Sequence, residues 1–178
     1  MRKLLILLVL ISGSIIAQPT SYGNFKVADQ EIIYQKVFTE DSITAAKLAE
    51  HYKKLDFVSN LKQTSTGVQF DMNDLIVDYK KFQFSQVGTP PIIQTGKYSG
   101  KVSVDVRDGR YRVTVNQIQM TGNIGYKNIT AKENLTNYAT KNSGTLLHPD
   151  WCKPNTLGLL DQAFTDKLQY PGKGKEDW

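Results

Sequence analysis

The residues best suited to chemistry lie together in the segment His148-Pro149-Asp150-Trp151-Cys152. A cysteine accompanied by a histidine and an acid could act as a thiol nucleophile, with the imidazole as its base. Such groups react only when the fold brings them together, and no thiol-hydrolase motif surrounds Cys152. We therefore expect Cys152 and Trp151 to pack where a C-terminal helix meets a sheet. Hydrolysis by Cys152 and His148 is kept as the alternative function.

No other set of residues in the sequence has the spacing of a catalytic or metal site. One cysteine and two distant histidines, His51 and His148, do not give the ligand spacing of a zinc site. The aspartates between residues 71 and 78 lack the glycine and the closing glutamate of a calcium loop. There is no glycine-rich loop for phosphate. The sequence thus predicts no catalytic residue, no metal and no cofactor, and it leaves the binding residues unknown.

Residues 1–17 have the layout of a cleavable secretory signal. Two cations precede an apolar run from Leu4 to Ile11, and small residues lead to Ala17. The expected cleavage site lies between Ala17 and Gln18. The apolar run is too short to span a membrane, which takes about 20 residues. The sequence therefore predicts export to the periplasm or the cell envelope, with no transmembrane segment after signal removal.

The charge balance argues against a nucleic-acid partner. Removing Arg2 and Lys3 with the signal lowers the 22 basic residues to 20, against 17 acidic ones, a net charge of +3. No dense basic stripe remains, so nucleic-acid binding is not expected. The single cysteine excludes an internal disulfide framework. We expect one domain at residues 31–170, preceded by a flexible leader at 18–30 and followed by a tail at 171–178.

The stretch Lys97–Met120 predicts a β-hairpin. Apolar residues occupy every second position on either side of Asp108-Gly109, a dipeptide suited to a type I′ turn. On the other face Asp105 is placed opposite Arg112, which is a favourable pair. A change of phase predicts either a bulge or the end of the strand near Asn116–Gln117. The predicted apolar pairs are Val106 with Tyr111, Val104 with Val113, and Val102 with Val115.

The other predicted elements follow from shorter patterns. Asp41-Ser42 is expected to cap an amphipathic helix, although Asp41-Ser42-Ile43 also matches a bacterial O-glycosylation sequon. Residues 127–144 form no clear pattern and could hold a short helix around Ala131–Ala139. A polar connection is expected at Ser59–Thr66. The remaining elements are strands at Glu31–Phe38, Val68–Met72 and Leu75–Phe84, and a last helix capped by Asn155-Thr156 and ended by Pro171.

The chain resembles an exported family of Bacteroidota proteins, a domain of unknown function with a TBP-like fold. The resemblance covers residues 31–122 and implies a fold and a location, but no functional residue. The term TBP-like describes topology and does not carry DNA binding with it. The residues that carry the likeness are Tyr98, Gly100, Val102, Val104, Val106, Asp108, Gly109, Arg110, Tyr111 and Arg112, supported by Tyr34–Val37 and Ser42.

These observations predict an α+β fold whose sheet is mostly antiparallel, with about five strands in the order β-α-β-β-β-β-α and helices on one face. The expected function is non-enzymatic binding of an unknown ligand or envelope protein. The hairpin face opposite the valines is interpreted first as an ordinary solvated face. Its alternative interpretation is an open sheet surface that receives a ligand or partner. That face carries Lys101, Ser103, Asp105, Arg107, Arg110, Arg112, Thr114 and Asn116.

Overall fold

The structure is a computed structural model that describes residues 19–172. The predicted signal peptide, its cleavage site at Ala17 and Gln18, and residues 173–178 of the predicted tail lie outside the described residues. The strands are β1 (Ser21–Tyr22), β2 (Phe25–Ala28), β3 (Glu31–Thr39), β4 (Val58–Gln63), β5 (Gly67–Ile76), β6 (Lys97–Arg107), β7 (Arg110–Ile124), β8 (Lys127–Asn134), β9 (Thr140–Lys141) and β10 (Leu146–Leu147). The helices are α1 (Ala45–Tyr52), α2 (Pro91–Thr95), α3 (Thr136–Ala139) and α4 (Leu157–Leu168).

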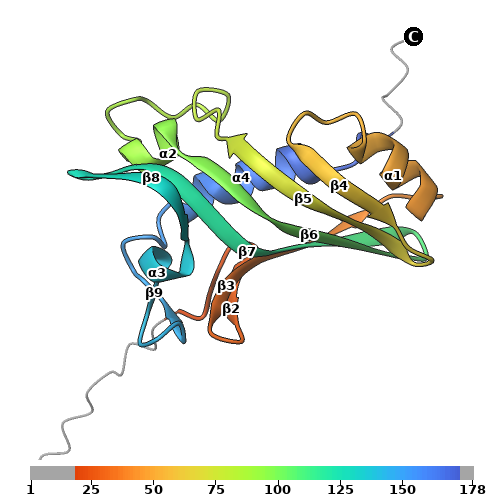
Figure 1. Ribbon diagram of the computed structural model, residues 1–178, viewed down its shortest axis with the longest axis horizontal. Coiled ribbons are helices and arrows are strands. Elements are labelled where there is room, and N and C mark those ends of the chain that lie inside the picture. Colours follow the sequence, from red (N-terminus) through yellow and green to blue (C-terminus); the bar gives the residue numbers. More distant parts are fainter. Residues whose placement is uncertain (1–18, 173–178) are drawn as a thin grey trace, which may run out of the picture.

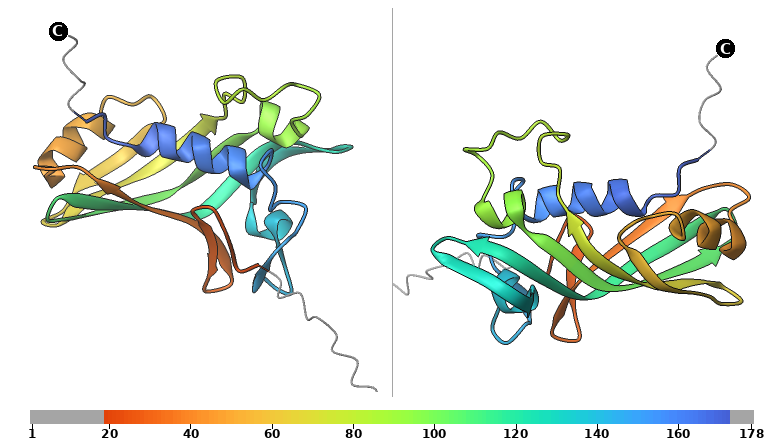
Figure 2. Two further views of the ribbon diagram at one scale, coloured as in Figure 1. Left: turned by 180° about the vertical axis from the view of Figure 1, so that it is seen from behind. Right: turned by 45° about the horizontal axis from the view of Figure 1, so that its top comes forward.

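Eight of the strands form one sheet. Its order is β1-β2-β3-β7-β6-β5-β4, with β8 also paired to β7, and every pairing is antiparallel. The long helix α4 passes behind the sheet in Figure 1, and Figure 2 shows it from the other side, between α1 and α2. The mostly antiparallel sheet is confirmed. The prediction of about five strands is wrong, because the main sheet alone has eight, and β9 and β10 form a second small sheet that brings the total in residues 19–172 to ten.

The β6–β7 hairpin has the predicted register. Val106 pairs with Tyr111, and the next two apolar pairs follow as expected. On the other face an Arg112 nitrogen lies 2.8 Å from a carboxylate oxygen of Asp105. The predicted bulge is present, because the register shifts between Ser99 and Lys101, and Gln117 has a positive φ of 50°. The two-residue periodicity therefore fixed both the buried face and the point where it breaks.

The helix α4 fills the centre of the core. Its Phe164 packs against Phe25 and Tyr34, with ring centroids 5.7 and 5.3 Å apart, in tilted and edge-on arrangements. All three side chains are fully buried. Burying an aromatic side chain of this size contributes about 2 kcal/mol or more. The apolar face of the sheet is thus committed to the helix, and the opposite face is left to solvent.

The prediction of a flexible leader at residues 18–30 is wrong for residues 21–28, which form β1 and β2. Phe25 pairs with Tyr34 of β3 and is fully buried. A strand of four residues is too short to display an alternating pattern, so its one large apolar residue did not stand out from a polar stretch. The sheet therefore begins about ten residues earlier than expected.

Three further local predictions are wrong. The polar connection at Ser59–Thr66 contains most of β4, an edge strand whose exposure leaves no apolar alternation. The strand expected at Leu75–Phe84 ends at Ile76. The short helix expected around Ala131–Ala139 is β8 followed by α3. The pattern of β4 was weak because it buries few side chains, whereas Val77, Tyr79 and Phe84 pack against the core from a loop and so gave the appearance of a strand.

The start of α1 also differs from the prediction. The Thr44 hydroxyl, not Asp41-Ser42, caps the helix by accepting a hydrogen bond of 3.2 Å from the Lys47 N–H. Ser42 instead has a positive φ of 63° in the turn before the helix. The amphipathic pattern itself is confirmed, since Leu48 and Tyr52 are the buried residues of α1.

Candidate functional site

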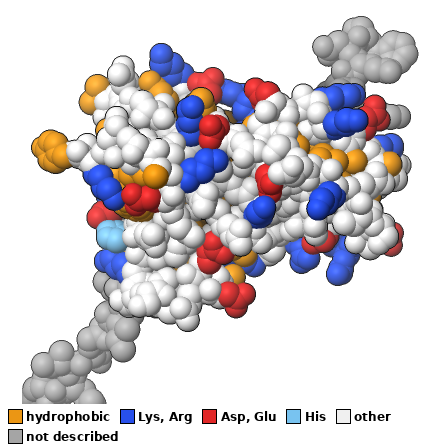
Figure 3. Space-filling model, viewed as in Figure 1, with side chains coloured by type: hydrophobic (Ala, Val, Ile, Leu, Met, Phe, Trp, Pro, Cys, Tyr) orange, Lys and Arg blue, Asp and Glu red, His pale blue; other side chains and the backbone are white. Residues whose placement is uncertain are grey.

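The face of the sheet opposite the helices carries rows of polar side chains. One row crosses three strands as Asp71, Lys101 and Asn116, and the next crosses them as Gln69, Ser103 and Thr114. These residues alternate with the buried ones, so the same periodicity that builds the core sets this face. In Figure 3, which views this face, basic and acidic side chains are interspersed among uncharged ones.

A hollow of about 700 Å³ lies over these two rows, between β4 and β7. Its bottom includes parts of Phe70 and Val102, and its rim is polar. The polar residues that line it are Asn60, Lys62, Gln69, Lys101, Ser103 and Gln117, together with Asp71 and Asn116. A space of this size lies near the middle of the range of small-molecule sites.

Three bulges interrupt the strands at or beside the hollow. Each one contains a residue with positive φ: Asn60 at 53° in β4, Asp74 at 49° in β5 and Gln117 at 50° in β7. Bulges bend a strand and redirect its side chains, and they are frequent near binding and active sites. Asn60 and Gln117 line the hollow itself. The shape of the hollow is therefore built into the backbone.

A fixed charge pair crosses the hollow. Lys101 Nζ lies 2.8 Å from Asp71 Oδ1, and Asn60 Nδ2 donates to Asp71 Oδ2 over 2.7 Å. The hydrogen bond from Asn60, followed by that from Lys101, lowers the pKa of the Asp71 carboxyl below its usual value. The carboxylate is thus ionised at neutral pH and held in one orientation by two partners.

Asn116 offers an unused acceptor next to this pair. Its Oδ1 is buried, and no donor within the described residues reaches it. A buried polar atom without a partner costs about 1–3 kcal/mol. Native structures rarely keep such atoms without a reason, and a ligand donor is one of the reasons that would account for it.

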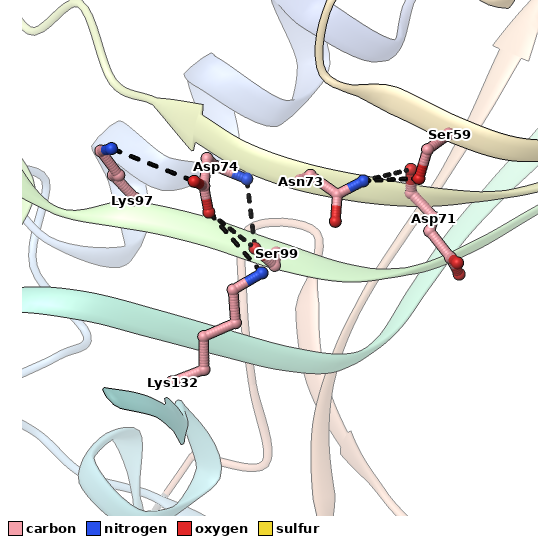
Figure 4. Close-up of polar contacts among 7 residues, drawn as sticks. All are labelled: Ser59, Asp71, Asn73, Asp74, Lys97, Ser99 and Lys132. Carbon is pink, nitrogen blue, oxygen red and sulfur yellow. Dashed lines mark hydrogen bonds and ion pairs between the residues drawn. The ribbon is translucent and has the colours of Figure 1, made fainter. Parts of the chain in front are cut away.

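The bulge of β5 is tied down by a polar network (Figure 4). The Asp74 N–H donates to Ser99 Oγ over 3.1 Å, and the Asp74 carboxylate lies 3.9 Å from Lys97 Nζ and 3.6 Å from Lys132 Nζ. Asn73 Nδ2 donates to Ser59 Oγ over 2.7 Å. The network joins four strands, so one end of the polar face is held in a single shape.

The structure does not assemble the Cys152–His148 pair of the alternative hydrolase hypothesis. Within residues 19–172 there is no hydrogen bond between the Cys152 thiol and the His148 imidazole; instead, His148 Nδ1 accepts from the Asp150 N–H over 3.1 Å. The Asp150 carboxylate binds Lys153 Nζ at 3.0 Å. Burial raises the pKa of the Cys152 thiol, which opposes formation of the thiolate nucleophile. This geometry gives no support to a thiol hydrolase.

The described residues contain neither a cluster of potential metal ligands nor a helix able to cross a bilayer. No group of three or more His, Cys, Asp or Glu side chains in residues 19–172 is arranged to hold a metal ion. Over the same residues, no helix combines the length and apolar character needed to cross a bilayer.

Some of the residues that line the hollow were not predicted from the sequence. Asn60 and Lys62 belong to β4, which the sequence indicated as a connection, and no apolar alternation could have revealed it. Gln69 and Asp71 were within a predicted strand, but its pairing with β6 was not predicted. Lys101, Ser103 and Asn116 lie on the face that was predicted.

No protein-family model and no curated protein matches the chain. The chain is similar to the crystal structure of a DUF4468 family protein from Bacteroides ovatus, with 15% identity, a TM-score of 0.46, and coverage of 85% of this chain and 94% of that one. It is also similar to a TBP-like protein from Parabacteroides distasonis, with 11% identity, a TM-score of 0.46, and coverage of 78% and 87% respectively.

Both similar proteins come from Bacteroidales, and one is TBP-like. At these identities and scores, nothing about function follows for this chain.

Proposed function

We propose that this chain is a non-enzymatic binding domain and that its polar sheet face, centred on the hollow between β4 and β7, receives a ligand or partner. The observation that carries the proposal is the unpartnered, buried Oδ1 of Asn116 in a hollow whose rim is bent by bulges. A solvated face would keep its polar atoms in water. Here one acceptor is withdrawn from solvent without a partner in residues 19–172, and a ligand donor would satisfy it once the Asn116 side chain turns toward the hollow.

The chemistry of the hollow favours a ligand rich in hydrogen-bonding groups. Amide and hydroxyl side chains at Asn60, Gln69, Ser103 and Gln117 can donate and accept at once. The main ionic group, the Asp71 carboxylate, is already neutralised by Lys101. A neutral polar molecule, or a polar part of a larger ligand, fits this lining better than an apolar one.

We further propose that the protein acts outside the cytoplasm, in the periplasm or the cell envelope. The support is the arrangement of residues 1–17, with two cations, a short apolar run and small residues before Ala17. Expression with an epitope tag at the C-terminus, followed by cell fractionation and mass determination of the purified chain, tests this. Recovery of a full-length chain from the cytoplasm would contradict it.

The binding proposal is tested by nuclear magnetic resonance with a panel of defined polar compounds: amino acids, short peptides, sugars and dicarboxylates. We expect at least one compound to produce saturable shifts of backbone amides near Ser103, Asn116 and Gln117. Ser103→Phe, which fills the hollow from a half-exposed position, should abolish those shifts. Ile33→Phe on β3 adds an aromatic ring to the same face outside the hollow and should leave them unchanged.

Two results would count against the proposal. One is a panel in which no compound gives saturable shifts. The other is a compound whose shifts centre on the helical side of the sheet and persist in Ser103→Phe.

A further inference from the structure

All arginines of the described chain lie at one end of the polar face. They are Arg107, Arg110 and Arg112, in the β6–β7 hairpin, and every other basic residue of residues 19–172 apart from the histidines is a lysine. Arginine and lysine carry the same charge, but only the guanidinium is a planar fork that matches the two oxygens of a carboxylate or phosphate. Their concentration at one place therefore concerns more than net charge.

The pairing of the hairpin brings these three guanidinium groups together. Arg107 lies directly opposite Arg110, next to the turn, and Arg112 follows Arg110 two residues later on the same face. Side chains opposite each other have Cβ atoms about 5 Å apart, and i,i+2 neighbours are about 7 Å apart. All three groups can thus converge on one small ligand.

Only one of the three has a carboxylate partner. Arg112 binds Asp105 at 2.8 Å, whereas neither Arg107 nor Arg110 forms an ion pair with any acid in residues 19–172. The other acids nearby are Asp108 in the turn, Asp41 beside Gly109, and Glu40, whose N–H donates to the Gly109 carbonyl oxygen; none lies within ion-pair distance of the arginines. Two like charges directly opposite each other destabilise a hairpin. The arrangement disfavours folding and favours the arrival of an anion.

A second hollow of about 250 Å³ lies among these residues. It is lined by the three arginines, Asp105, Tyr111 and Val37, and Val37 is 54% exposed. The neighbouring outward-facing residue on β6 is Ser103, which lines the larger hollow. The two hollows are therefore consecutive along one strand.

We infer that this arginine hollow binds the oxyanion, a carboxylate or a phosphate, of a small acidic ligand whose neutral polar part lies in the larger hollow beside Ser103. The inference rests on the proposed binding function and adds the charge of the ligand and its orientation. Arg107 and Arg110 supply the charge-assisted hydrogen bonds, and Asp105 holds Arg112 at the edge of the site. The exposed Val37 contacts the carbon chain next to the oxyanion.

Arginine side-chain resonance spectra of the purified protein at low salt test this directly, because residues 19–172 contribute three Nε–Hε signals. Succinate and inorganic phosphate are titrated separately. We expect saturable shifts of the Arg107 and Arg110 signals with at least one of them, and the arm that binds more tightly identifies the oxyanion. Arg110→Gln should raise the dissociation constant about tenfold or more, because one charged hydrogen-bonding partner is lost.

Two matched variants distinguish recognition by the planar guanidinium group from general electrostatic attraction of an anion. Arg110→Lys keeps the charge and should still weaken binding several-fold. Lys80→Gln makes the same change of charge as Arg110→Gln at an exposed loop position and should change the constant less than twofold. Arg107→Gln replaces Arg110→Gln if the latter fails to fold. Equal weakening by Lys80→Gln and Arg110→Gln, or an absence of saturable arginine shifts in both titrations, would overturn the inference.

The oxyanion site and the proposed binding function can each be rejected without rejecting the other. If the arginine signals stay unmoved while panel compounds shift the amides of Ser103 and Gln117, the larger hollow binds and the oxyanion site alone is rejected. If the arginine signals respond and Ser103→Phe leaves ligand affinity unchanged, the arginine hollow binds by itself and the role of the larger hollow is rejected.

Discussion

Replacing Tyr52 by Phe should destabilise the protein by removing one buried hydrogen bond. The Tyr52 hydroxyl donates to the carbonyl oxygen of Leu168 over 2.6 Å, and both residues are fully buried. Leu168 is the last residue of α4, so its carbonyl has no partner within the helix. Without the hydroxyl this acceptor stays buried and unpaired, which costs about 1–3 kcal/mol. For a domain of this size, that lowers Tm by roughly 2–12 °C.

Tyr34→Phe is the matched control. The Tyr34 hydroxyl bonds to Thr165 Oγ1 at 3.0 Å, but Lys36 Nζ donates to the same oxygen over 3.0 Å and Thr165 can still donate to Asp161. Thr165 is therefore left with partners, and we expect a loss below about 1 kcal/mol. Urea unfolding followed by circular dichroism measures both variants, with unchanged m-values as the sign that the comparison is valid. A Tyr52→Phe variant as stable as the original chain, or less affected than Tyr34→Phe, would refute the reasoning.

Three further outcomes follow from the structure. Burial lowers the pKa of the His51 imidazole, so the unfolded chain takes up the proton at a higher pH than the folded chain does. The free energy of unfolding should have its full value above about pH 7 and should fall as the pH drops through 6.5 and below. Urea titrations at several pH values would show this slope, and His51→Phe should remove it. Gly144→Ala should lower the free energy of unfolding by about 1–2 kcal/mol or more, because φ is +82° and the new Cβ would lie 2.2 Å from the Gln30 carbonyl oxygen; thermal unfolding measures it, and an unchanged Tm would contradict the close approach. Arg110→Thr should raise the free energy of unfolding by about 0.2–1 kcal/mol, because it removes the like-charge pair with Arg107, and a loss of stability in urea would show that Arg110 has a favourable partner.

The hairpin was predictable because its burial is one-sided and regular. Val102, Val104 and Tyr111 meet the helices and their neighbours meet water, so the period of two is visible in the sequence and fixes the register. The bulge at Gln117 was predictable for the same reason, since it is where that period changes phase. Both features can be recognised from the order of neighbouring residues in the sequence.

The strands that were not predicted from the sequence lack such a regular local pattern. β4 and β2 lie toward the margins of the sheet and bury few side chains, so Lys62 and Lys26 look no different from residues of a loop. The candidate site has the same difficulty in another form. It depends on which strand lies beside which, and the contact between Asp71 and Lys101 joins residues 30 positions apart. Spacing in sequence carries no information on such a pairing until the sheet order is known.

The division of each strand into a buried and an open face has a consequence for how the protein can change. Along β6 and β7, alternate positions meet different requirements: Val102 and Val113 are buried in the core, whereas Ser103 and Arg112 lie on the open face, where Arg112 pairs with Asp105. Under the proposed function, substitutions on the open face alter selectivity with a smaller effect on stability than substitutions in the core. A deep mutational scan of this hairpin should show tolerance that oscillates from one residue to the next, and ligand preference should be free to diverge while the scaffold stays the same.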